Sequence, residues 1–166
     1  MANVTFQQEP VTLVGNEVKV GDEAPSFKVL SNDLEEVTLT DYKEKVKLIS
    51  VVPSIDTGVC AEQTKRFNEE ADQIENVKVL TVSMDLPFAQ KRWVNQHDIK
   101  KLDTLSDHRD AHFGKNYGVL IEELRLLARS IFVVDSNNIV TYVEYVKEVS
   151  NHPDYDAALE AARQAK

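Results

Sequence analysis

The stretch VKLISVVPSIDTGVC, residues 46–60, sets the fold of this chain. It begins with a largely apolar run rich in β-branched side chains, residues 46–52, which is typical of a strand buried on both faces of a sheet. Pro53 ends the strand, and apolar side chains then recur at helical spacing from about Cys60 to Ile74. The sequence therefore predicts a buried strand, a short loop and a helix, with the only cysteine of the chain where that helix begins.

Further strands and helices are expected on both sides of this stretch. The expected strands are residues 4–6 and 11–14 as an N-terminal β-hairpin, then 18–20, 27–30, 37–39, 77–84, the end of a strand at 104–107, 126–134 and 139–146. The expected helices are residues 87–96, 111–117 and 154–164. This order of elements favours an α/β, thioredoxin-like fold, with a mixed central sheet flanked by helices, and one domain over residues 1–166.

Composition and charge exclude several classes of protein. The net charge of −9 argues against a nucleic-acid partner, because phosphate binding requires clustered Lys and Arg. No apolar run approaches the roughly 20 residues of a membrane helix, so no membrane partner is expected. Residues 1–8 are polar and lack the features of a secretory signal, which favours a cytoplasmic location.

Cys60 is the first candidate for chemistry. A lone cysteine is most often a small buried hydrophobic residue, and a single cysteine cannot form an intrachain disulfide. At the start of a helix, however, unpaired amides and the helix dipole stabilise a thiolate, which is the nucleophilic form. Thr57 lies three residues earlier, within reach of a hydrogen bond to sulfur or to a bound oxygen. The sequence therefore predicts that Cys60 is a nucleophile.

Other motif matches point to different chemistry. Cys60 and Arg66 have the Cys-x5-Arg spacing of cysteine phosphatases, but no glycine lies between them and Glu62 would repel an anion, so a helix is favoured. His108 and His112 have a spacing that can bind zinc on a helix, yet no third ligand is evident. We expect a surface pair of histidines, and neither a metal ion nor another cofactor.

The segment PSIDTGVC, residues 53–60, resembles the active-site loop of the peroxiredoxins, whose pattern is Pro-x-x-x-Thr/Ser-x-x-Cys. Its particular form is similar to that of the thiol peroxidase subfamily. Further blocks resemble the same subfamily in matching order: DLPFAQ at 85–90, TLSDHRD at 104–110 and LLAR at 126–129. The resemblance implies a homodimeric, thiol-dependent peroxidase that reduces hydrogen peroxide and alkyl hydroperoxides.

The resemblance also implies a role for each residue of the site. Cys60 would be the peroxidatic nucleophile, attacking one peroxide oxygen and becoming a sulfenic acid. Thr57 would hold the thiolate and the incoming oxygens through its hydroxyl. Arg129 would stabilise the thiolate and the charge that develops on the departing oxygen. Pro53 would shield the thiolate from water.

One position departs from the subfamily pattern. Thiol peroxidases generally carry a resolving cysteine on the helix after DLPFAQ, which forms an intrachain disulfide that thioredoxin reduces, but Val94 stands there. The change is either engineered or natural, and residues 95–98 also depart from the expected Gly/Ala-rich stretch, which favours natural loss. Resolution is therefore expected from an external thiol, either thioredoxin or a small thiol.

The missing cysteine keeps a second function open. A peroxide sensor or redox-relay protein would oxidise quickly and then pass the oxidation to a partner protein through a mixed disulfide. A binding module without activity is less favoured because Thr57, Cys60 and Arg129 are all present. Phe88 and Trp93, at helical spacing, are expected in the core or in a dimer interface.

Overall fold

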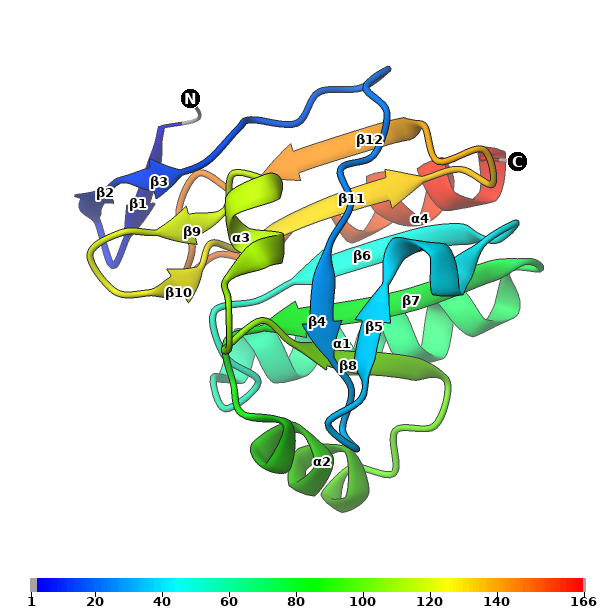
Figure 1. The fold of residues 1–166 in the computed structure, drawn as a ribbon, viewed down its shortest axis with the longest axis horizontal. Coiled ribbons are helices and arrows are strands. Elements are labelled where there is room, and N and C mark those ends of the chain that lie inside the picture. The colour runs from blue at the N-terminus through cyan, green and yellow to red at the C-terminus, as the bar shows by residue number, and fades with distance from the viewer. Residues whose placement is uncertain (1–2, 166) are drawn as a thin grey trace.

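The structure is a computed structural model that describes residues 3–165, and its largest element is a seven-stranded mixed sheet (Figure 1). β6, β7 and β8 run parallel to one another, and the other neighbouring pairs are antiparallel. The predicted mixed central sheet is confirmed. From edge to edge the strands are β12 (Val140–Tyr145), β11 (Ser130–Val134), β6 (Val46–Val51), β7 (Val77–Ser83), β8 (Leu102–Ser106), β4 (Lys28–Leu30) and β5 (Glu36–Thr38).

Helices cover both faces of this sheet. In Figure 1, α1 and α4 lie behind the sheet and α3 lies in front of it, while α2 packs beside β8. No helix within residues 3–165 is long and apolar enough to cross a membrane. The helices are α1 (Gly58–Glu70), α2 (Pro87–Gln96), α3 (His112–Asn116) and α4 (Tyr155–Gln164), with the short 3-10 turns η1 (Leu39–Tyr42) and η2 (Ala71–Gln73).

The β6 strand is apolar on both faces because each face packs against a separate core. Leu48 belongs to the cluster that contains Phe67 of α1, whereas its neighbour Ile49 belongs to the cluster that contains Phe113 of α3. Successive side chains of a strand point to opposite faces, so the apolar residues of this strand fill both cores. Complete burial of each such side chain contributes about 1.5–3 kcal/mol, which fixes β6 at the centre of the fold.

Two smaller sheets hold the N-terminal segment. β1 (Val4–Phe6) and β2 (Glu9–Val11) form an antiparallel hairpin, as predicted, but its second strand lies earlier than the expected residues 11–14 because the turn has only two residues. β3 (Leu13–Val14) leaves the hairpin and pairs with β9 (Leu120–Ile121), which pairs with β10 (Leu126–Leu127).

The prediction of a strand at residues 18–20 is wrong. Gly15, with a φ of +106°, turns the chain away from the sheet, and a side chain there would lie 2.0 Å from the carbonyl oxygen of Lys115. The N–H of Val18 then donates to the hydroxyl of Tyr145 at 2.8 Å instead of entering a strand ladder.

The strand expected over residues 126–134 is interrupted. β10 pairs with β9, whereas β11 pairs with β6 and β12, so the chain moves from one sheet to another at Ala128 and Arg129. The N–H of Ala128 donates to the carbonyl of Val119 at 2.8 Å, and the carbonyl of Arg129 accepts from Val146 at 3.1 Å. This crossing places Arg129 between the two sheets.

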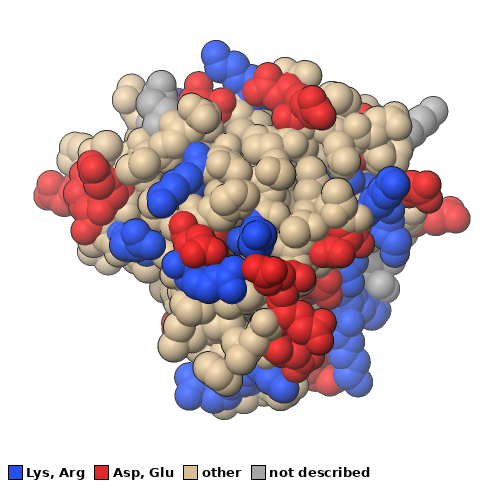
Figure 2. All heavy atoms as spheres, in the orientation of Figure 1, with Lys and Arg blue, Asp and Glu red and all other residues tan. Residues whose placement is uncertain are grey.

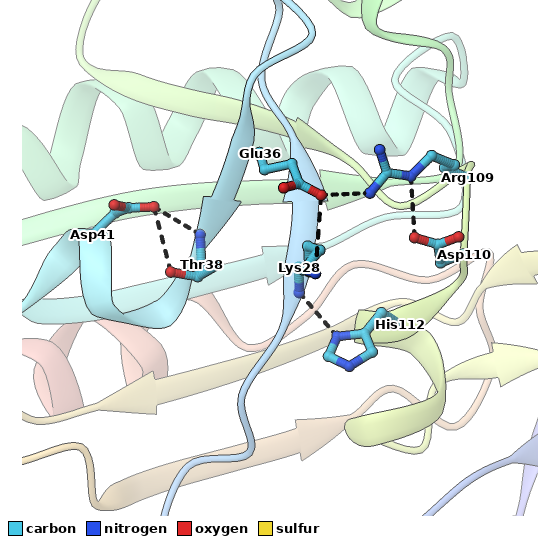
Figure 3. A network of polar contacts seen from close by, with 7 residues as sticks. All are labelled: Lys28, Glu36, Thr38, Asp41, Arg109, Asp110 and His112. Atoms are coloured by element: carbon cyan, nitrogen blue, oxygen red, sulfur yellow. Dashed lines mark hydrogen bonds and ion pairs between the residues drawn. The ribbon is translucent and has the colours of Figure 1, made fainter.

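Polar side chains form a network along the open edge of the sheet (Figure 3). Arg109 donates to Glu36 at 2.8 Å and to Asp110 at 3.1 Å, and Nδ1 of His112 accepts the N–H of Lys28 at 2.9 Å. Exposed ion pairs of this kind contribute at most about 1 kcal/mol each. On the face drawn in Figure 2, basic and acidic side chains are interspersed.

The turn between β8 and α3 depends on a buried carboxylate. Asp107 accepts the N–H of Phe113 at 3.0 Å and the N–H of Gly114 at 2.8 Å. Burial raises the pKa of Asp107 to about 6, although these two hydrogen bonds oppose the rise. The same carboxyl in the unfolded chain titrates near pH 4, at about 3.9.

We predict that Asp107 makes stability depend on pH between these two values. The folded chain holds more protons there than the unfolded chain, so the free energy of unfolding falls as pH rises from about 4 to about 6, by on the order of 1–3 kcal/mol. Urea unfolding at pH 4.5 and 7.5 measures this loss, which Asp107→Asn removes and the control Asp98→Asn, at an exposed position, keeps. An identical pH dependence in all three proteins would contradict the prediction.

Candidate active site

The N-terminus of α1 is capped by Thr57 and places Cys60 in the first turn. The hydroxyl of Thr57 accepts the N–H of Cys60 at 3.3 Å and donates its single proton to the carbonyl of Ser54, also at 3.3 Å. The helix begins at Gly58, two residues earlier than expected. Cys60 is 0% exposed, so its thiol is shielded from solvent and lies near the positive, N-terminal end of the helix dipole.

The loop before α1 is held by the carboxylate of Asp85. Oδ1 accepts the hydroxyl of Ser54 at 2.7 Å, and Oδ2 accepts the N–H of Ile55 at 2.9 Å and the hydroxyl of Ser83 at 2.6 Å. The backbone carbonyl of Asp85 in turn accepts the hydroxyl of Ser106 at 2.5 Å. Asp85 therefore ties the loop to the ends of β7 and β8, a role that the sequence did not assign to the first residue of DLPFAQ.

Arg129 is a buried cation with neutral partners. It is 2% exposed, its Nη1 donates to Oε1 of Gln63 at 2.8 Å, and its Nε donates to the carbonyl of Val149 at 2.7 Å. Within residues 3–165 no carboxylate pairs with this guanidinium. A buried charge without a counter-ion is costly, so this arrangement favours an anion nearby. A thiolate or a developing oxyanion is such an anion.

Gln63 connects Arg129 to the helix that carries Cys60. It is fully buried, and its Nε2 donates to the hydroxyl of Ser50 on β6 at 2.6 Å. The hydroxyl of Thr64 caps the carbonyl of Cys60 at 2.8 Å. The sequence reasoning missed Gln63. Its position three residues after Cys60, one helical turn along, was the available signal.

A pocket of about 290 Å³ lies at the N-terminus of α1. Thr57 and Arg129, predicted from distant parts of the sequence, both line it. Pro53 and Cys60 are buried in the adjoining loop and helix. The full lining is Phe6, Gln7, Thr57, Gly58, Val59, Arg129, Val149 and Ser150.

Val94 lies on α2, half-buried, and packs against the same apolar cluster to which Cys60 belongs. Beside it Trp93 is 5% exposed and stacks on the ring of His97, with 4.3 Å between centroids. Trp93 is thus a core residue, as one of the two expectations had it. Phe88 is 67% exposed and is not part of the core.

The phosphatase and zinc alternatives do not fit the geometry. Arg66 lies on α1, where it pairs with Glu70 and Asp156 and its guanidinium sits 4.3 Å from the ring centre of Tyr155. The residues between Cys60 and Arg66 are helical, so they do not form a phosphate-binding loop. Across the described part of the chain, no group of three or more His, Cys, Asp or Glu side chains is placed to hold a metal ion.

The chain is similar to known proteins over almost its whole length. The family model described as Redoxin matches residues 19–159. A thiol peroxidase of Oceanobacillus iheyensis is 68% identical over 159 residues, covering 96% of this chain and 97% of the relative, and one of Bacillus subtilis is 61% identical over 163 residues, covering 98% of each. The crystal structure of a peroxiredoxin-like protein from Aquifex aeolicus has a TM-score of 0.92 at 41% identity and covers 99% of this chain and 97% of that one. The predicted thioredoxin-like fold is confirmed.

We predict that Gln63→Leu impairs both folding and chemistry. It leaves a buried N–H of Arg129 without an acceptor, which lowers the free energy of unfolding by about 1–3 kcal/mol. The misplaced guanidinium should slow the reaction of Cys60 with hydrogen peroxide by about ten- to a hundredfold. Urea unfolding and stopped-flow oxidation measure the two effects, with Gln96→Leu on the exposed face of α2 as control. Wild-type reactivity in Gln63→Leu would contradict the prediction.

Proposed function

We propose that Cys60 is the residue that attacks the peroxide in this chain. The chain belongs to the Redoxin family and is a thiol-dependent peroxidase. The observation that carries this proposal is the placement of the only cysteine in the first turn of α1, next to a pocket shared by Thr57 and the buried Arg129. The peroxide enters that pocket, and Arg129 supplies the positive charge that the neutral partners of its guanidinium leave uncompensated.

In the proposed step, the thiolate sulfur of Cys60 attacks one peroxide oxygen in line with the O–O bond. An S–O bond forms, the O–O bond breaks, and the departing oxygen takes a proton to leave as an alcohol or water. Sulfur loses two electrons and becomes a sulfenic acid. Arg129 stabilises the negative charge through N–H donors, and the hydroxyl of Thr57 turns from Ser54 toward the peroxide. Pro53, buried in the loop before α1, keeps water from the thiolate.

Recycling in this proposal requires an external thiol. Val94 occupies the position where thiol peroxidases generally carry a resolving cysteine, and the chain has no other cysteine. Thioredoxin or a small thiol attacks the sulfenic acid, water leaves, and a mixed disulfide remains, which a second thiol reduces. The same observation supports the alternative, a sensor or relay in which a partner protein supplies the thiol. Sustained turnover with thioredoxin or a small thiol favours the enzyme, and a single turnover favours the relay.

We also propose that the chain forms a homodimer in the cytoplasm. Leu86 is 53% exposed and Phe88 is 67% exposed, so they place apolar surface at the start of α2. This surface follows Asp85, whose carboxylate holds the loop before α1. Exposed apolar side chains of this size are enriched in interfaces. A monomer mass by sedimentation velocity would contradict the dimer.

One domain over residues 1–166 stays a prediction of the sequence.

We predict that Cys60 reacts with peroxide far faster than free cysteine and that Arg129 accounts for much of the difference. Cys60→Ser should abolish the reaction, and Arg129→Ala should slow it about 100- to 1,000-fold, as expected for loss of a transition-state donor. Stopped-flow kinetics with hydrogen peroxide measure the rates. Arg66→Ala, which removes a partly exposed arginine on α1, serves as the control and should retain the wild-type rate. A rate equal to that of free cysteine in the wild type would refute the proposal.

We predict that Val94→Cys restores intrachain resolution. After one equivalent of peroxide, this variant should lose both free thiols and carry a disulfide between residues 60 and 94. Intact mass and thiol alkylation detect the product, and Val94→Ser, similar in size but without a thiol, should keep one oxidised cysteine and no disulfide. Persistence of a free thiol at residue 94 after oxidation would show that this position is not suited to resolution.

A further inference from the structure

Glu148 lies beside the active-site pocket and binds both of the segments that form one of its walls. Its Oε1 accepts the N–H of Gln8 at 2.7 Å and the hydroxyl of Thr5 at 2.9 Å, and its Oε2 accepts the N–H of Ser150 at 2.8 Å and the N–H of Gln7 at 3.3 Å. One carboxylate thus joins the turn of the N-terminal hairpin to the loop after β12.

The hairpin turn needs such an acceptor. Gln7 and Gln8, the two residues between β1 and β2, have φ values of 52° and 70°. Left-handed backbone costs roughly 1–2 kcal/mol for each residue other than glycine. Consecutive N–H groups in such a turn point to the same side and form a concave site for an anion. The carboxylate of Glu148 occupies that site and offsets the strain.

The held segments form a part of the pocket wall that α1 does not supply. Phe6 and Gln7 line the pocket from the hairpin, and Val149 and Ser150 line it from the loop. Backbone hydrogen bonds of 2.8 Å from Thr5 to the carbonyl of Lys147, and from Val149 to the carbonyl of Thr5, align the two segments. Phe6 is only partly buried and gives this wall an apolar surface, whereas Val149 is fully buried behind it. Hydrogen peroxide has no group to fill such a surface, whereas an organic hydroperoxide has.

We propose that Glu148 is a positioning residue that holds the hairpin turn, and with it Phe6, as the apolar wall of the pocket, and thereby sets the preference for organic hydroperoxides over hydrogen peroxide. This inference rests on the proposed attack of Cys60 on a peroxide in that pocket. Hydrogen bonds from Ser150, ahead of those from Gln8 and Thr5, lower the pKa of Glu148 to about 2. The carboxylate therefore stays ionised, and the wall stays in place, throughout the pH range near neutrality.

Glu123 provides a matched control. Its carboxylate also holds the N-terminal segment, accepting the N–H of Thr12 at 2.9 and 3.1 Å and the hydroxyl of Thr12 at 2.8 Å. Neither Glu123 nor Thr12 lines the pocket. Glu123→Ala therefore loosens the same segment without touching the wall that contains Phe6.

The test compares second-order rate constants for oxidation of Cys60 by cumene hydroperoxide and by hydrogen peroxide. Glu148→Ala should lower the ratio of these constants about tenfold, the size expected for one apolar contact, while the hydrogen peroxide constant changes about twofold at most. Phe6→Ala should lower the ratio similarly, and the double variant should fall no further, because both changes remove the same wall. Glu123→Ala should keep the wild-type ratio. If Glu148→Ala does not fold, Glu148→Gln, which keeps the size but loses the charge, should give an intermediate ratio.

The inference would be overturned if Glu148→Ala or Glu148→Gln left the ratio of rate constants unchanged. An equal fall in the rate constants for both peroxides would give that result, and Glu148 would then act on general stability or on Arg129. A failure of the wild type to react with either peroxide is a separate result, and it would overturn the proposed function.

Discussion

The buried guanidinium of Arg129 is the charge on which the rest of the site depends. It reaches the interior because the chain crosses from β10 to β11 at this residue, between two sheets. Its described partners are the side-chain oxygen of Gln63 and the carbonyl of Val149. Both are neutral, so they accept hydrogen bonds from the guanidinium but do not neutralise its positive charge. A buried cation of this kind is stabilised by an anion, and the first turn of α1 positions Cys60 to provide one.

The site joins separate parts of the chain around that charge. Asp85 fixes the loop before Cys60, Gln63 links α1 to β6, and Glu148 ties the hairpin turn to the loop after β12. Each of these three side chains makes several hydrogen bonds and is buried or half-buried, so that breaking one of the bonds leaves a polar group without a partner and costs free energy. The pocket is therefore organised before a peroxide arrives.

Much of the fold was predictable because hydrophobic periodicity reports burial directly. The run that became β6, the helix after it and the first strand of the N-terminal hairpin all follow from local pattern, whereas the second strand lies at residues 9–11 and not at 11–14. The strand expected at 126–134 was too long because Leu126 and Ile131 are both apolar, and apolarity alone does not say which sheet a residue joins. Cys60, Thr57 and the position of Arg129 came from motifs. Glu148 carried no sequence signal, since the N–H groups of Gln7 and Gln8 that it accepts lie 141 and 140 residues away.

In the proposed function Cys60 attacks peroxide, and the chain has no second cysteine with which to resolve the product. The most direct test is the intact mass of the reduced protein after one equivalent of hydrogen peroxide, without added thiol and then with a small thiol. We expect a gain of one oxygen at Cys60, trapped by a sulfenic-acid reagent, followed by conversion to a mixed disulfide with the added thiol. A protein that gains no oxygen, or that gains it at a residue other than Cys60, would contradict the proposed attack by Cys60.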